Sequence, residues 1–203
     1  MSGKVFVGNS AMHLMLLLLA FLSAQAWAGP MEDAAAANAR GDYAAQLRII
    51  RPLAANGVAW AQTGLGWMYD KGEGVVQNYA EAVKWYRLAA VQGDAPAQVN
   101  LGLMYANGQG VAQNYAEAVR LYRLAAAQGV APAQYSLGVM YANGQGVAQN
   151  YAEAMRLYRL AAAQGFADAQ SNLGVMYAKG QGVQKNDAEA VKWYRLAAAQ
   201  GLA

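Results

Sequence analysis

A segment of 36 residues repeats along most of this chain, and this repetition limits the possible folds more than any other feature. Residues 115–150 read YAEAVRLYRLAAAQGVAPAQYSLGVMYANGQGVAQN, and residues 79–114 and 151–186 are near copies. Residues 43–78 form a more diverged copy, and residues 187–203 match the first half of another. Self-similarity at a period of 20–50 residues is typical of stacked arrays, not of one globular core. We therefore expect a repeat domain over residues 43–203.

Each copy has the pattern of two antiparallel helices. In residues 79–114, apolar residues recur at helical spacing from Tyr79 to Ala90. Asn78 and Glu81 have the spacing of a capping box at the start of this first helix. Gly93 suits its end, because glycine readily adopts the left-handed backbone conformation. A second helix follows, and the half copy over residues 187–203 predicts a first helix that caps the stack.

Polar and small residues inside the second helices also recur with the repeat. We expect the glutamines at Gln98, Gln134 and Gln170 to form hydrogen bonds between helices. Glycine in a helix costs about 1 kcal/mol relative to alanine, so its recurrence needs a packing reason. We interpret these glycines as positions where the backbone of a neighbouring helix, near Ala89 and Ala90, comes close. They are Gly66, Gly102, Gly138 and Gly174.

The first 28 residues have the pattern of a secretory signal peptide. Lys4 precedes the apolar run Leu14–Leu22, and Ala26-Trp27-Ala28 has the form of a cleavage site. We expect the protein to be exported to the periplasm or secreted, with no transmembrane segment after cleavage; an uncleaved N-terminal anchor is the alternative. Residues 29–42 are rich in alanine and predict either a short helix or a disordered lead-in.

The composition argues against several classes of function. The chain has no cysteine, and its single histidine, His13, lies in the expected leader. No Ser/His/Asp set or metal-ligand cluster is evident, so we predict no enzymatic activity and no metal. Gly108-Gln109-Gly110 lacks the third glycine of a dinucleotide fingerprint and follows a helix, so we predict no cofactor. The formal net charge of +3 is too small to indicate nucleic acid.

Pairs of basic residues three positions apart recur in the first helices, and we call these pairs the basic ladder. Residues three apart share a helix face, so stacking aligns ten of the fifteen lysines and arginines. The ladder is either a binding surface for an acidic or extended peptide or an anionic envelope polymer, or a solvated face neutralised by glutamates three residues earlier. Its members are Arg48, Arg51, Lys84, Arg87, Arg120, Arg123, Arg156, Arg159, Lys192 and Arg195.

Positions that vary while the repeat stays constant are further candidates for partner contacts. One second-helix position reads Thr63, Val99, Tyr135 and Ser171 in successive copies. Another reads Trp67, Leu103, Val139 and Val175. We expect partner binding at Trp67, Val99 and Tyr135 and along the basic ladder.

The repeated motif resembles the Sel-1-like repeat, a relative of the tetratricopeptide repeat. The residues that carry the resemblance are Leu101-Gly102, Met104-Tyr105, Gly108, Gly110-Val111, Ala118, Tyr122, Ala125-Ala126 and Gly129, with counterparts 36 residues away. The resemblance covers residues 43–203 and implies an all-α fold, a right-handed α/α superhelical solenoid with a concave groove. It also implies a protein-interaction scaffold, in bacteria often of the envelope. Cysteine-rich relatives described as β-lactam hydrolases match poorly, because this chain has no cysteine.

We therefore predict a monomeric, non-enzymatic scaffold that binds a protein or peptide, including an acidic one, in its groove. Two alternatives remain: a hydrolase acting on the cell wall or β-lactams, and a binder of an anionic envelope polymer. The repeat units are predicted at residues 43–78, 79–114, 115–150 and 151–186, with the capping helix at 187–203.

Overall fold

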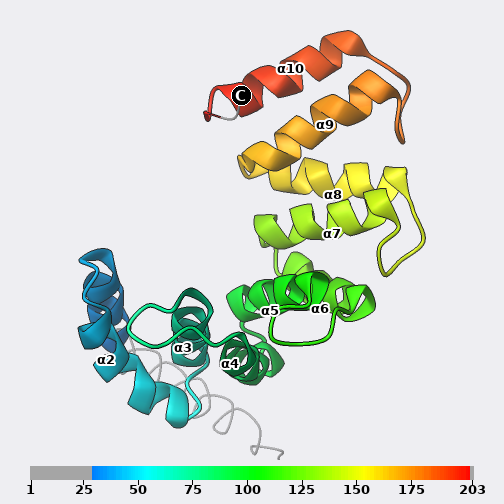
Figure 1. The fold of residues 1–203 in the computed structure, drawn as a ribbon. Coiled ribbons are helices and arrows are strands. Elements are labelled where there is room, and N and C mark those ends of the chain that lie inside the picture. Colours follow the sequence, from blue (N-terminus) through cyan, green and yellow to red (C-terminus); the bar gives the residue numbers. More distant parts are fainter. Residues whose placement is uncertain (1–28, 202–203) are drawn as a thin grey trace, which may run out of the picture.

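The computed structural model describes residues 29–201, which form a curved stack of helices (Figure 1). Residues 1–28, with the expected signal peptide, and residues 202–203 lie outside the described residues. Residues 29–39 are helical, and no strand occurs in the described part. The helices that follow are α2 (Tyr43–Ala55), α3 (Ala59–Lys71), α4 (Tyr79–Val91), α5 (Ala95–Asn107), α6 (Tyr115–Ala127), α7 (Ala131–Asn143), α8 (Tyr151–Ala163), α9 (Ala167–Lys179) and α10 (Asp187–Ala198). The predicted α/α solenoid is confirmed.

From α4 onward, the first helices begin at asparagine caps, as the sequence predicts, whereas α2 begins at Asp42. The Asn78 side chain accepts from the backbone N–H of Glu81 at 3.1 Å, and Asn114, Asn150 and Asn186 make the same bond at 3.0 Å. The other half of the expected capping box is absent. The Asn78 N–H donates instead to the Tyr69 carbonyl at 2.9 Å, in the preceding second helix. This leaves the Glu81 carboxylate free to pair with Lys84.

The mid-helix glycines face a tyrosine ring, so our expectation of a close helix backbone was wrong. A Cβ on Gly102 would lie 2.6 Å from Cε1 of Tyr122 in α6. Gly66, Gly138 and Gly174 meet the tyrosine one helix on in the same way. Because glycine has no side chain, the flat tyrosine ring fits against the helix, and Tyr122 is 1% exposed there. This fit joins each second helix to the first helix that follows.

Close backbone contact occurs at the loops instead. The turn residue Gly110 has φ +67°, and a Cβ there would lie 2.3 Å from the carbonyl carbon of Tyr79. Gly146 and Gly182 meet Tyr115 and Tyr151 in the same way. Each loop after a second helix therefore rests on the start of the preceding first helix, where only glycine fits.

Glutamine side chains connect neighbouring repeats, as predicted. Gln98 is buried and donates from Nε2 to the Ala90 carbonyl at 3.2 Å. Its Oε1 accepts from Gln128 Nε2 at 3.0 Å, and the same Gln128 atom donates to the Gly93 carbonyl at 3.1 Å. A buried amide is stable only when its hydrogen bonds are satisfied, so this chain of bonds fixes the position of each repeat against the next.

For residues 29–42 we expected either a short helix or a disordered lead-in, and the structure has a helix over residues 29–39. Ala34 and Ala37 are 3% and 1% exposed, and Ala34 packs in one cluster with Ile50 and Ala54. Between residues 29 and 201, no helix is both long and apolar enough to cross a bilayer. The 13-residue helices extend about 20 Å, whereas a bilayer core is about 30 Å thick.

Candidate functional site

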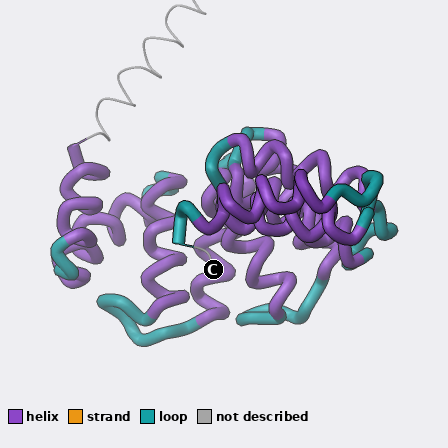
Figure 2. Tube along the Cα trace, turned by 90° about the horizontal axis from the view of Figure 1, so that it is seen from above, coloured by secondary structure: helices purple, strands orange, loops and turns teal. Residues whose placement is uncertain are grey.

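The stack has two helical surfaces that carry different residues. We call the exposed side of α2, α4, α6, α8 and α10 the first-helix face, and that of α3, α5, α7 and α9 the second-helix face. Connecting loops lie along the edges of the stack (Figure 2). The basic ladder belongs to the first-helix face, and Trp67 and Tyr135 belong to the second-helix face.

The first base of each ladder pair, from α4 onward, forms an ion pair within its own helix. Arg120 Nη2 lies 2.6 Å from Glu117 Oε1, and Arg156 Nη2 lies 2.7 Å from Glu153 Oε1. Lys84 and Lys192 pair with Glu81 and Glu189 in the same way. The hydrogen bond from Arg120 holds the pKa of Glu117 below its ordinary value, although partial burial opposes this. These charges are largely neutralised locally.

In α4, α6 and α8, the second base of the pair contacts a tyrosine of the following helix. Arg87 Nη2 donates to the Tyr105 hydroxyl at 2.7 Å, Arg123 to Tyr141 at 2.8 Å, and Arg159 to Tyr177 at 2.9 Å. The guanidinium carbon of Arg87 also lies 5.6 Å from the centre of the Tyr105 ring, a cation–π distance. In the described chain, Arg48, Arg51 and Arg195 form no ion pair.

Hollows between the first helices carry these paired groups. The larger one, of about 570 Å³, lies between α4 and α6 and is lined by Arg87, Glu117, Arg120 and Leu124, among others. The hollow between α6 and α8 repeats this lining one period later, with Arg123, Glu153 and Arg156. The charged groups of these two hollows already have partners, so a ligand that binds in either hollow must replace existing bonds.

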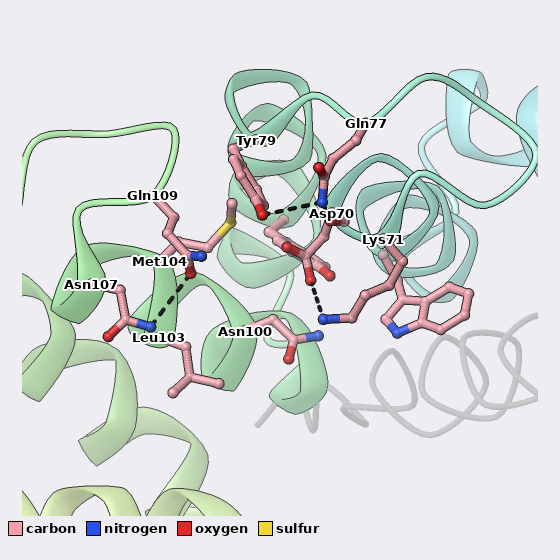
Figure 3. Close-up of a pocket in the computed structure, with 11 residues that line it drawn as sticks. Asp70, Lys71, Gln77, Tyr79, Asn100, Leu103, Met104, Asn107 and Gln109 are labelled. Carbon is pink, nitrogen blue, oxygen red and sulfur yellow. Dashed lines mark hydrogen bonds and ion pairs between the residues drawn. The ribbon is translucent and has the colours of Figure 1, made fainter.

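A groove of about 360 Å³ lies on the second-helix face between α3 and α5 (Figure 3). Trp67, Asp70 and Lys71 come from α3, and Asn100 and Leu103 come from α5. Lys71 Nζ lies 3.0 Å from Asp70 Oδ2. The lysine side chain is 51% exposed and the aspartate side chain 19%. The groove therefore contains a partly sheltered carboxylate, an indole and amide side chains.

One wall of this groove contains the buried hydroxyl of Tyr86. Tyr86 is 1% exposed and lines the groove. Its hydroxyl is fully buried and lies beside Asn100. Burial raises the pKa of Tyr86 above its ordinary value, and the nearby Asp70 charge raises it further, whereas Asn100 lowers it. Because this hydroxyl is not exposed, the groups that the groove presents to a ligand are those of Trp67, Asp70 and Asn100.

The equivalent groove two repeats later has different chemistry. This groove, of about 260 Å³, lies between α7 and α9 and contains Val139, Ala142 and Asn143 where the first contains Trp67, Asp70 and Lys71. Tyr158 and Asn172 take the positions of Tyr86 and Asn100. The frame is the same, but the indole and both charges are missing.

The three predicted variable-position contacts have different surroundings. Trp67 and Tyr135 are half-buried and line the first and second of these grooves. The Tyr135 ring centre lies 5.2 Å from that of Phe166. Val99 is 8% exposed and packs with Ala125 and Ala133. Val99 therefore belongs to the core and is not presented to a partner, in contrast to our expectation.

Sequence reasoning missed Asp70, Lys71 and Asn100 as candidates. The first two replace the Ala-Asn pair of the next two copies, Ala106-Asn107 and Ala142-Asn143. That departure was a usable signal, but the sequence did not show that it faces a groove. No group of three or more His, Cys, Asp or Glu side chains in the described part is arranged to hold a metal ion.

Comparison with known proteins identifies the repeat. The family model of the Sel1 repeat matches residues 61–94, 95–130, 131–166 and 167–202. Each matched unit begins in or at a second helix and includes the next first helix, so it is half a period out of step with our units. The helix contacts agree with the matched units, since α3 packs more extensively against α4 than against α2.

Solved structures show the same fold. A Sel1 repeat protein from Oxalobacter formigenes is 37% identical, with a TM-score of 0.79, over 85% of this chain and 68% of its own. A protective antigen present in uropathogenic Escherichia coli strains, which displays an SLR fold, is 43% identical with a TM-score of 0.75. That match covers 78% of this chain, which spans only 34% of the antigen's chain. Among curated proteins, no significant match was found.

Proposed function

This chain belongs to the Sel1 repeat family, and we propose that it is a non-enzymatic scaffold that binds an extended segment of a partner protein on its second-helix face. Members of this family are generally protein–protein interaction scaffolds. The observation that carries the proposal is the groove between α3 and α5, where Asp70 and Asn100 gather beside Trp67. Groups of this kind bind peptide backbone and side chains together.

The contrast between the two faces supports this choice. The hollow of about 570 Å³ lies on the first-helix face, but its arginines and glutamates already bind one another or neighbouring tyrosines. The same groups recur there in every period, so they offer little basis for selecting a partner. The second-helix face varies from repeat to repeat, since Val139, Ala142 and Asn143 line one groove where Trp67, Asp70 and Lys71 line the other.

Site-specific photo-crosslinking tests the proposal. Leu103 on the second-helix face and Leu124 on the first-helix face are 42% and 43% exposed, so they are matched positions for p-benzoylphenylalanine. We expect full-length protein, expressed in its own cell, to crosslink one partner from position 103 and not from position 124. Partner capture from position 124 alone, or from neither position, would refute the proposal.

We also propose that the scaffold acts after export, in the periplasm or outside the cell. The support is the N-terminal sequence, with Lys4, the run Leu14–Leu22 and Ala26-Trp27-Ala28. Mass spectrometry of the purified protein from fractionated cells should find a mature N-terminus at Gly29 outside the cytoplasm. Recovery of the protein only from the cytoplasm, with residues 1–28 retained, would contradict export.

A further inference from the structure

Building on the proposed function, we propose that the groove between α3 and α5 binds a basic side chain of the partner segment, with arginine preferred over lysine. Two residues that occur in no other copy, Trp67 and Asp70, coincide at this one groove, beside Lys71, which recurs as Lys179. Residues 43–78 form a more diverged copy, so it is the meeting of the indole and the carboxylate at one groove that indicates a dedicated subsite.

The charge of the groove determines the sign of the ligand. Asp70 is the carboxylate of the lining, and its side chain is 19% exposed, which partly shelters it from solvent. Its present partner, Lys71, is 51% exposed and lies next to it in sequence. Exposed ion pairs contribute little to stability, so an incoming cation can replace Lys71 at little cost.

The remaining groups favour a guanidinium. Its planar fork carries five N–H donors, and Asp70 and Asn100 both offer acceptor oxygens at the groove. The half-buried Trp67 adds an aromatic surface, on which guanidinium groups stack well. An ammonium group is smaller and more strongly hydrated, so it satisfies fewer of these acceptors.

The groove between α7 and α9 serves as a control within the same molecule. It keeps the tyrosine, asparagine and methionine of the frame but contains Val139 and Ala142 in place of Trp67 and Asp70. A guanidinium has no carboxylate to pair with there. Binding of a basic probe should therefore affect Asn100 and leave Asn172 unchanged.

The test uses the full-length protein and a small probe, N-acetyl-L-arginine methylamide, followed by NMR. We expect saturable shifts of the Trp67 indole N–H and the Asn100 amide, and no shift of Asn172. The neutral isostere N-acetyl-L-citrulline methylamide should bind at least about tenfold more weakly, as expected for loss of a charge-assisted pair. Equal binding of both probes, or no shift at Trp67, would overturn the inference.

Two neighbouring substitutions should act in opposite directions. Asp70→Asn should weaken probe binding about tenfold, whereas Lys71→Gln should strengthen it, because it removes the competing cation. A general folding defect cannot produce opposite signs. If both variants weaken binding, Asp70 is not the recognition group. Val139→Trp combined with Ala142→Asp should in turn create shifts at Asn172, and their absence would argue against the assigned roles.

The outcome separates this subsite from the wider proposal. Crosslinking from position 103 to a partner, with no probe binding at Trp67, would end the arginine assignment and leave the scaffold function standing. Probe binding without any crosslinked partner would end the scaffold proposal and leave the arginine subsite standing.

Discussion

Individual glycines in this fold have roles that depend on what lies opposite them. Gly64 and Gly66 are two residues apart in α3, and both lie inside the helix. A Cβ on Gly66 would lie 2.8 Å from the Tyr86 ring, whereas one on Gly64 would meet only Ile50 Cδ1 at 3.5 Å, an ordinary contact. The same residue type therefore serves packing at one position and has no comparable steric role at the other.

Alanine substitutions at these two glycines should have opposite effects. Gly64→Ala should stabilise the protein by up to about 1 kcal/mol through helix propensity. Gly66→Ala should destabilise it by about 1–3 kcal/mol, because the buried Tyr86 ring must move. Urea unfolding of the full-length variants checks both values. Stabilisation by Gly66→Ala would show that the Tyr86 ring can accommodate a Cβ at position 66.

Buried tyrosines should make the protein sensitive to alkali. Burial raises the pKa of Tyr158 from 10.0 to about 12 in the folded state. The stabilisation from this shift is fully present below pH 10 and is lost as the pH rises through 12, because the unfolded tyrosine ionises first. The urea midpoint should therefore fall across this range, and it should fall less in Tyr158→Phe. An equal fall in both proteins would contradict this assignment.

At the scale of the helix, the capping asparagine and the following glutamate serve separate purposes. Asn114 caps α6 through the N–H of Glu117 at 3.0 Å. The Glu117 carboxylate turns away from the cap and binds Arg120 through both its oxygens. The helix start is then completed by the Tyr105 carbonyl, which accepts from the Asn114 N–H at 2.9 Å. A carbonyl of the preceding helix therefore accepts the hydrogen bond that the glutamate would accept in a capping box.

Substitutions at the start of α6 should separate these roles. Asn114→Ala should cost about 1 kcal/mol of stability, since it removes the side-chain cap. Glu117→Gln should cost less than about 1 kcal/mol, because an exposed ion pair contributes little. Thermal unfolding of the two variants provides the measurement. A larger loss for Glu117→Gln would mean that the carboxylate helps to cap the helix after all.

At the scale of the whole molecule, stability comes from contacts between neighbours. One helix or repeat is joined to the next by three kinds of contact: tyrosine rings packed on mid-helix glycines, loops that pack closely at glycine, and hydrogen bonds between glutamines. In such an array, the free energy of unfolding is close to a sum over repeats and their interfaces. Repeats can therefore be removed in whole periods without disturbing the remaining contacts.

Removal of residues 115–150 should give a shorter protein that still folds. Asn114 would then precede Tyr151, and the junction would restore the native motif with its asparagine cap. Circular dichroism should show unchanged helicity per residue in the repeat region, with a lower melting temperature because one repeat and its interfaces are lost. Removal of residues 115–132, half a period, is the control and should disrupt the stack. Unfolding of the 36-residue deletion would show that distant repeats depend on one another.

The sequence by itself determined the helices, their caps and their stacking. The 36-residue period and the Asn, Gly and apolar pattern act over one or two helical turns, and such short-range preferences can be read residue by residue. It also indicated that Gln98 and its equivalents join helices. The position of Trp67 on a variable surface was likewise predictable, because its site changes while the frame does not.

Only the tertiary structure decided what each face presents. The burial of Val99, the tyrosine opposite Gly66 and the pairing of the basic ladder all depend on residues about 20–35 positions away or on the choice among side-chain partners. The same holds for the groove between α3 and α5, where Asp70 and the Tyr86 hydroxyl lie near Asn100 of the next repeat. A period shows that neighbouring helices stack, but side-chain packing sets which polar atoms find partners and which remain open to a ligand.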